Sequence, residues 1–184
     1  MQFPTHLKDY FPSSTSKELT TSFSLFNTKQ ELKDFVSRAR KTNTLSLWFD
    51  FSDTQTPNPW TRRLLGVGVA IEQGEGGYAD FAEEDILEAL TDVLSDENVR
   101  KVGHDCKTTV AFLSTRGLKL KGRCFDTRVA AYVLNPSRRT QELSDIVVQF
   151  LQLPLSNTED LVGDQKVLKG MERLNRDSLA RLTA

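Results

Sequence analysis

The sequence predicts an α/β fold in which a mixed sheet carries helices on both faces. Three apolar segments follow one another at Leu45–Phe51, Leu64–Ile71 and Tyr78–Phe81, and the glycine-rich turn Gly74–Gly77 precedes the third. Such a series is typical of an antiparallel three-strand meander. Beyond it, strand-like and helix-like segments alternate, which favours a sheet flanked by helices.

The first part of the chain is expected to supply a helix and the first core strand. Thr28 and Glu31 form a capping-box pattern, which predicts the start of a helix whose apolar stripe ends at Ala39. In the strand Leu45–Phe51, successive side chains alternate between two faces. Asp50 is therefore expected on the face opposite the leucine and phenylalanine side chains.

Two strand-to-helix units occupy the segment Val99–Pro136, around which the rest of the chain is organised. Asp126 is expected to cap the second of its helices, and Asn135-Pro136 to end it. Val110 is assigned to the apolar stripe of the first helix. The elements predicted after the meander are helices at Ala82–Leu94, Asp105–Thr115, Thr127–Leu134, Gln141–Gln152 and Asn175–Leu182, strands at Val99–Gly103, Leu118–Leu120 and Cys124–Phe125, and a polar loop at Ser156–Gly170.

Composition indicates one compact domain, because 184 residues with 38% hydrophobic content can bury a sizeable core. Residues 1–23, rich in Ser, Thr and Pro, are expected to be a flexible lead-in, and residues 24–184 to form the domain. Cys106 and Cys124 lack a zinc-binding spacing and are expected to be reduced thiols. No apolar run of signal or membrane length occurs at the N-terminus, so an intracellular chain without a membrane partner is expected.

Charge is unevenly distributed although the formal net charge is only −1. Residues 82–98 carry seven acidic side chains and no Lys or Arg, whereas residues 99–139 carry ten basic side chains and two acidic ones. This asymmetry suits a domain with one anion-facing side. The solvated faces of two ordinary surface elements explain it equally well.

The sequence also resembles a known family. KVGHDCK followed by a helix, and then RGLKLKGRCFDTRVAAYVLNP, is similar to the core of the 3′→5′ proofreading exonuclease domain of DNA polymerase I, in the family A DNA polymerases. The similarity covers roughly residues 45–155, and GRCFDTRVAAYVLNP is its most specific part. The resemblance implies the RNase H-like (DnaQ-like) exonuclease fold.

Exonucleases of that family use two divalent metal ions held by four carboxylates, because in-line attack on a phosphate needs both the entering and the leaving oxygen neutralised. Asp50 matches the first-strand aspartate, but Ser52 stands where the family has glutamate. Asp53 is displaced by one residue, which points it to the other face of a strand. The helix aspartate is replaced by Thr109, and Asp105 lies one helical turn earlier.

The last family motif, Tyr-x-x-x-Asp, is absent from the sequence, and either truncation or divergence accounts for this. Only Asp50 remains in place, and one carboxylate cannot hold two Mg²⁺ ions. The resemblance therefore implies an exonuclease domain that has lost its reaction and binds no metal tightly; Mg²⁺ or Mn²⁺ would be its cofactor if it were active.

Several residues are candidates for contact with nucleic acid. Lys107 matches a basic position of the family helix, and Arg138 and Arg139 follow the Asn-Pro stop; all three are phosphate-contact candidates, with surface charge as the alternative. Trp48 and Trp60 could stack on bases. Core packing is the preferred interpretation for Trp48, and loop exposure is the simple one for Trp60.

Three hypotheses remain open from the sequence. The first is a degenerate exonuclease domain that acts as a structural and DNA-binding domain beside the polymerase domain of the same natural protein, in the cytoplasmic nucleoid or a eukaryotic organelle. The second is an active 3′→5′ exonuclease on DNA or, as in the similar ribonuclease D group, on RNA, with Asp50, Asp53 and Asp105 as rearranged ligands or with ligands supplied by missing C-terminal residues. The third is a protein-interaction module with the same fold.

Overall fold

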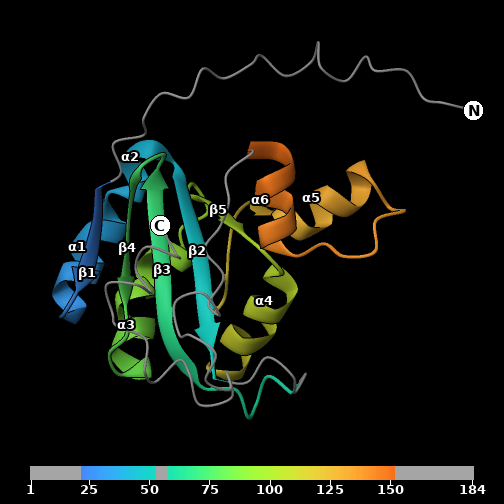
Figure 1. Ribbon diagram of the computed structural model, residues 1–184. Coiled ribbons are helices and arrows are strands. Elements are labelled where there is room, and N and C mark those ends of the chain that lie inside the picture. The colour runs from blue at the N-terminus through green and yellow to red at the C-terminus, as the bar shows by residue number, and fades with distance from the viewer. Residues whose placement is uncertain (1–21, 53–57, 152–184) are drawn as a thin grey trace, which may run out of the picture.

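The computed structural model describes residues 22–52 and 58–151 (Figure 1). Their order is β1 (Ser22–Phe26), α1 (Lys29–Ser37), α2 (Ala39–Thr42), β2 (Thr44–Phe51), β3 (Leu64–Glu72), β4 (Glu75–Ala79), α3 (Glu83–Leu94), β5 (Arg100–Gly103), α4 (Cys106–Thr115), β6 (Cys124–Asp126), α5 (Thr127–Leu134) and α6 (Leu143–Leu151). The predictions for Asp53, Ser156–Gly170 and Asn175–Leu182 lie outside the described residues.

One mixed sheet contains the six described strands in the order β1-β4-β3-β2-β5-β6. β2, β3 and β4 form the antiparallel meander, while β5 pairs in parallel with β2, and β6 in parallel with β5. β1 pairs in parallel with β4 at the other edge. The predicted mixed sheet with its three-strand meander is confirmed.

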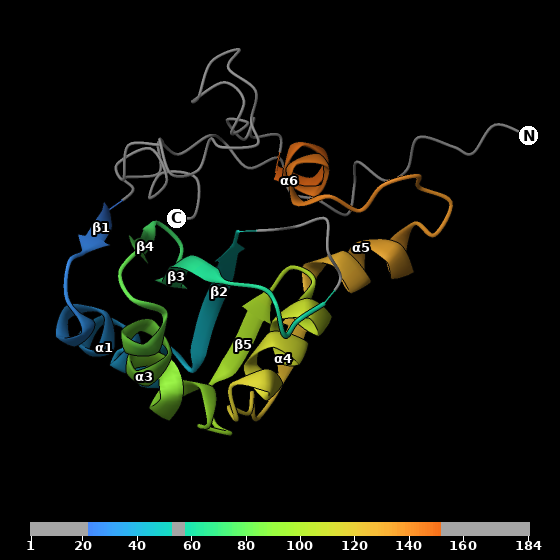
Figure 2. The same ribbon diagram turned by 90° about the horizontal axis from the view of Figure 1, so that it is seen from below.

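The core lies between one face of the sheet and the helices α1, α3 and α4. Alternate residues of β2, from Leu45 to Phe51, are buried on this face against apolar side chains of the three helices. Figure 2 shows these helices on one side of the sheet and α6 on the other. Leu143 at the start of α6 lines a pocket with Trp48 on that second face. Helices therefore cover both faces, as predicted.

Local hydrogen bonds explain where two helices begin. The Thr28 hydroxyl accepts from the backbone N–H of Glu31 at 3.2 Å, which confirms the predicted cap of α1. The Glu31 carboxylate accepts from the backbone N–H of Asn27 at 2.7 Å. The bond lies one residue before the position that a capping box would use. Asp126 caps α5 by accepting from the backbone N–H groups of Arg128 and Val129, so this prediction is also confirmed.

The sequence does not predict β1. Ser22 and Phe23 are assigned to the flexible lead-in, but they begin this strand, in which Ser22 pairs with Glu75 and Phe26 with Ala79. The strand is short, and Phe26 is its one buried residue. Its partner is distant in the sequence, so no local pattern indicates the pairing.

Three smaller predictions are also wrong. The hairpin turn is at Gln73-Gly74, where Gly74 has a φ of 82°, so that residues 75–77 belong to β4. Leu118 and Leu120 form no strand; they pack against the core from an irregular segment. Val110 is 41% exposed, because α4 turns Phe112 and Leu113 toward the core instead.

Candidate functional site

Asp50, which matches the expected first-strand ligand, is buried near the end of β2. Its side chain is 7% exposed. The Tyr78 hydroxyl of β4 donates a hydrogen bond to its Oδ2 atom at 3.0 Å. Burial raises the pKa of Asp50 from 3.8 to about 6, and the hydrogen bond from Tyr78 opposes this rise. The carboxyl group is thus withdrawn from water and held by a neighbouring side chain.

Tyr78 reaches Asp50 by crossing β3 at a glycine. Asp50 pairs with Gly66 in the β2–β3 register, and Tyr78 pairs with Gly68 in the β3–β4 register. A Cβ atom on Gly66 would collide with the Tyr78 hydroxyl and would lie 2.7 Å from the carbonyl oxygen of Ala79. The missing side chain at Gly66 is therefore what allows the tyrosine to cover Asp50.

At the other expected ligand positions that the structure describes, the side chains are two hydroxyls and one carboxylate bound by its neighbours. Ser52 is exposed just after β2, where its backbone N–H donates to the carbonyl of Arg63 at 3.0 Å. Thr109 is half-buried in α4. Asp105 precedes α4 in the left-handed conformation (φ 56°), accepts from the Thr108 hydroxyl at 2.8 Å, and pairs with Arg128 at 3.5 Å. Its carboxylate stabilises the start of α4.

The residues that the structure describes do not fit a two-metal centre. Within residues 22–52 and 58–151, no group of three or more His, Cys, Asp or Glu side chains is arranged to hold a metal ion. Mg²⁺ needs several hard oxygen ligands to offset the loss of its water shell. The carboxyl group at the expected position is buried, and the Tyr78 hydroxyl donates to one of its oxygens.

Asp126 connects two helices that the sequence treats separately. Besides capping α5, its carboxylate accepts from the backbone N–H groups of Asp105 at 3.2 Å and Cys106 at 2.7 Å. From the end of β6, this one side chain therefore caps the start of α5, which follows it, and the start of α4, which follows the neighbouring strand β5. The sequence predicts only the first of these roles.

Of the three phosphate-contact candidates, one lies on a helix and two lie in the connection between α5 and α6. Lys107 is exposed in the first turn of α4, whereas Arg138 and Arg139 follow α5. Arg138 donates to the side chain of Gln149 and to the carbonyl of Asp145. In the described part of the chain, no hydrogen bond or ion pair involves the side chain of Lys107 or Arg139. These two are the better candidates for an external anion.

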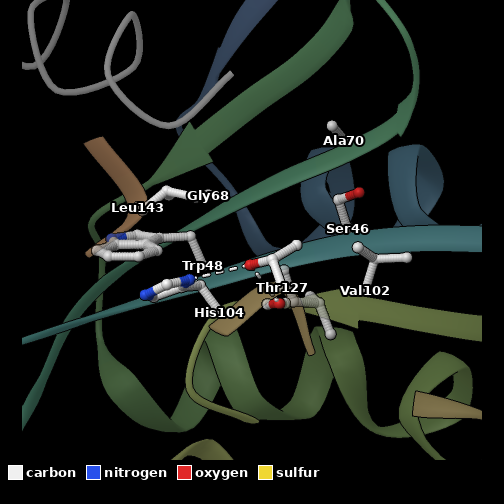
Figure 3. A pocket seen from close by; sticks show the side chains of 10 residues that line it. Ser46, Trp48, Gly68, Ala70, Val102, His104, Thr127 and Leu143 are labelled. Atoms are coloured by element: carbon white, nitrogen blue, oxygen red, sulfur yellow. Dashed lines mark hydrogen bonds between the residues drawn. The ribbon is translucent and has the colours of Figure 1, made fainter. Parts of the chain in front are cut away.

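A pocket of about 160 Å³ lies on the same sheet face as Asp50 (Figure 3). The Thr127 hydroxyl donates to the carbonyl of Gly103 at 3.2 Å and lies 2.9 Å from His104 Nδ1, so we assign the proton to Nδ1. Among the residues that the structure describes, His104 Nε2 is a buried atom without a hydrogen-bond partner. Burial lowers the pKa of the imidazole. The lining residues are Ser46, Leu47, Trp48, Gly68, Ala70, Val102, Gly103, His104, Thr127 and Leu143.

This pocket corrects one prediction and adds a residue that the sequence misses. Trp48 is 38% exposed and lines the pocket, so its predicted core packing is wrong. Trp60 is 72% exposed, as expected for a loop residue. His104 carries no sequence signal, because the pocket is assembled from β2, β3, β5, α5 and α6. The pocket thus combines apolar walls with one hydrogen-bond acceptor, the Nε2 atom of His104.

Helices within residues 22–52 and 58–151 are all too short or too polar to cross a membrane. Solved structures define the class of fold. The chain is similar to RNase D of Trypanosoma brucei, with a TM-score of 0.67 and 18% identity over 90% of this chain and 61% of that one. It is also similar to the POL domain of Pol1 from M. smegmatis in complex with DNA primer-template and dNTP, with a TM-score of 0.61 and 23% identity over 73% of this chain and 23% of that one. The fold is RNase H-like.

The family follows from the sequence comparison. The family described as "DNA polymerase I, ribonuclease H-like domain" matches residues 52–164, and the chain belongs to this family. DNA polymerase I of Chloroflexus aurantiacus is 30% identical over 142 residues, covering 72% of this chain and 14% of that protein. DNA polymerase I of Mycobacterium tuberculosis is 36% identical over 91 residues, covering 48% of this chain and 10% of that protein. The chain thus spans about a seventh or less of these relatives.

Proposed function

We propose that this chain is a catalytically degenerate 3′→5′ exonuclease-like domain. It acts as a structural and DNA-binding domain beside a polymerase domain of the same natural protein, in the nucleoid or an organelle. The family match and the DNA polymerase I relatives support the polymerase context. The domain is proposed to begin at β1 (Ser22–Phe26) and to extend to residue 184.

The observation that carries the proposal is the burial of Asp50 beneath Tyr78. An aspartate that binds Mg²⁺ must present ionised oxygens to the ion, together with other carboxylates. Here the Tyr78 hydroxyl occupies one oxygen, and the side chain is almost fully buried. Ser52 and Thr109 add neutral hydroxyls where the family has carboxylates. A loss of metal binding and of nuclease activity is the simplest consequence.

Nuclease activity is therefore expected to be undetectable. The purified chain, incubated with a 3′-ended single strand and millimolar Mg²⁺ or Mn²⁺, should leave the strand at full length, because Ser52 and Thr109 replace two of the carboxylates that two-metal catalysis uses. Neither metal should shift the melting temperature, since an ion that binds the folded state would stabilise it. Metal-dependent shortening that disappears in Asp50→Ala would contradict the proposal and would point to Asp50, Asp53 and Asp105 as rearranged ligands.

RNA should be included among these substrates. The fold is similar to that of RNase D from Trypanosoma brucei and from Escherichia coli, with TM-scores of 0.67 and 0.65, so RNA is tested beside DNA as the substrate of an active chain. Degradation of a 3′-ended RNA, with no effect on DNA of the same sequence, would support this second candidate function. Degradation of neither strand supports the degenerate domain.

DNA binding is expected to be weak and strongly dependent on salt. Phosphate contacts release counterions, so the affinity falls as salt rises. Replacing both Lys107 and Arg139 by alanine should weaken binding and reduce the slope of log affinity against log salt by about two, one for each contact. Lys41→Ala is the control, because this exposed lysine lies on α2, away from α4 (Figure 1). Fluorescence anisotropy measures both quantities, and equal slopes for the parent and the double variant would exclude these residues as contacts. An interaction module that does not use nucleic acid would show no salt-dependent binding at all.

A further inference from the structure

Two free cysteines meet at the junction between α4 and β6. Cys106 is the first residue of α4, and Cys124 is the first residue of β6. Cys124 is exposed to solvent, whereas Cys106 is partly buried. The two residues are separated in sequence by the whole of α4 and the irregular segment that follows it, and the fold brings them together.

Strand register and hydrogen bonds define this approach. β6 pairs with β5 so that Cys124 lies opposite Lys101. Alternate residues of a strand share a face, so the side chain of Cys124 lies on the same face as that of Asp126. The Asp126 carboxylate accepts from the backbone N–H of Cys106 at 2.7 Å, and the Cys106 sulfur lies 3.8 Å from the carbonyl oxygen of Phe125. The Cys106 thiol is therefore held against β6.

The surroundings of the Cys106 thiol include the Cys124 side chain. Burial raises the pKa of the Cys106 thiol well above its ordinary range, and the neighbouring Cys124 side chain raises it further. Gly103 of β5 leaves room for the Cys106 sulfur, because a Cβ atom at this position would lie 3.0 Å from it. A disulfide needs Cβ atoms about 3.5–4.5 Å apart, and the hydrogen bond from the Cys106 backbone N–H to Asp126 holds the Cys106 backbone beside β6, where Cys124 lies two residues before Asp126.

We propose that Cys106 and Cys124 form a peroxide-sensitive site that closes into an intramolecular disulfide. The thiolate sulfur of the exposed Cys124 attacks one oxygen of hydrogen peroxide, the O–O bond breaks, and hydroxide leaves; the product is a sulfenic acid. The Cys106 sulfur then attacks the Cys124 sulfur, the S–O bond breaks, and water leaves with the remaining proton. Two thiols and one peroxide thus give one disulfide and two waters. The bond fixes the start of α4 to β6.

Peroxide treatment of the full chain tests this proposal. Non-reducing digestion and mass spectrometry should find a peptide in which residue 106 is linked to residue 124, and denatured protein should no longer react with a maleimide. The cross-link restricts the unfolded chain, so the melting temperature should rise by roughly 5 °C. Dithiothreitol should restore both the maleimide reaction and the original melting temperature.

Single substitutions provide matched controls. Cys106→Ser and Cys124→Ser each retain one thiol, and neither should gain thermal stability from peroxide. The proposal is overturned if peroxide leaves both thiols of the parent free, converts Cys124 to a sulfinic acid without a link to Cys106, or produces only disulfides between separate chains. These readouts do not depend on nuclease activity or DNA binding.

Discussion

Replacing Asp126 by alanine is expected to destabilise the protein by about 3–5 kcal/mol, because four charge-assisted hydrogen bonds at two helix starts are lost together. The carboxylate accepts from the backbone N–H groups of Asp105 and Cys106 at the start of α4, and of Arg128 and Val129 at the start of α5. Urea denaturation followed by circular dichroism measures the loss. The substitution should lower the denaturation midpoint without a large change in the slope.

Two control variants separate this double role from ordinary capping. Thr28→Ala removes a single hydroxyl cap from α1 and should cost about 1 kcal/mol. Asp126→Asn keeps an acceptor but removes the charge, and its cost should lie between the other two. If Asp126→Ala costs no more than Thr28→Ala, the bonds to Asp105 and Cys106 contribute nothing to stability, and Asp126 is an ordinary cap of α5.

The dual role of Asp126 illustrates how far the sequence leads. A capping residue that stands directly before an apolar pattern of helical spacing marks the start of that helix, so the cap of α5 is predictable from the sequence. The bonds to Asp105 and Cys106 depend on β6 lying beside β5, and strand pairing is not visible in local spacing. The same reason explains β1, whose five residues acquire a role only when they pair with β4.

The candidate site also has features that the sequence predicts and features that depend on strand pairing. Residue types alone indicate that Ser52 and Thr109 cannot replace carboxylates. The burial of Asp50 is not predictable, because it depends on Tyr78, two strands away, and on the missing side chain of Gly66. Trp48 shows the opposite error: a large aromatic residue in a core strand favours a buried interpretation, yet its face of the sheet carries a pocket.

The burial of Asp50 has a measurable cost. Its pKa is raised from 3.8 to about 6 in the folded protein. A carboxyl group with a raised folded-state pKa stabilises the protein below the unfolded-state pKa, and this contribution is lost as the pH rises through the folded-state pKa. The contribution of Asp50 to the free energy of unfolding is therefore lost between about pH 4 and pH 6. A shift of this size corresponds to about 3 kcal/mol between the two ends of this pH range.

Asp50→Asn is therefore expected to be more stable than the parent at pH 8, by up to about 3 kcal/mol, and close to it at pH 4. Asparagine fills nearly the same volume, can still accept from Tyr78, and carries no charge to desolvate. Urea denaturation of both proteins from pH 4 to pH 8 tests this, and the difference between them isolates Asp50 from other titrating groups. Asp92→Asn is the control: this exposed carboxylate pairs with Lys33 at 3.3 Å, so its removal should change stability by less than about 1 kcal/mol.

A working metal site predicts the opposite result, because an ionised Asp50 that holds a cation would make Asp50→Asn the less stable protein when Mg²⁺ or Mn²⁺ is present. The sign of the difference at pH 8, with and without metal, thus distinguishes a buried remnant from a ligand.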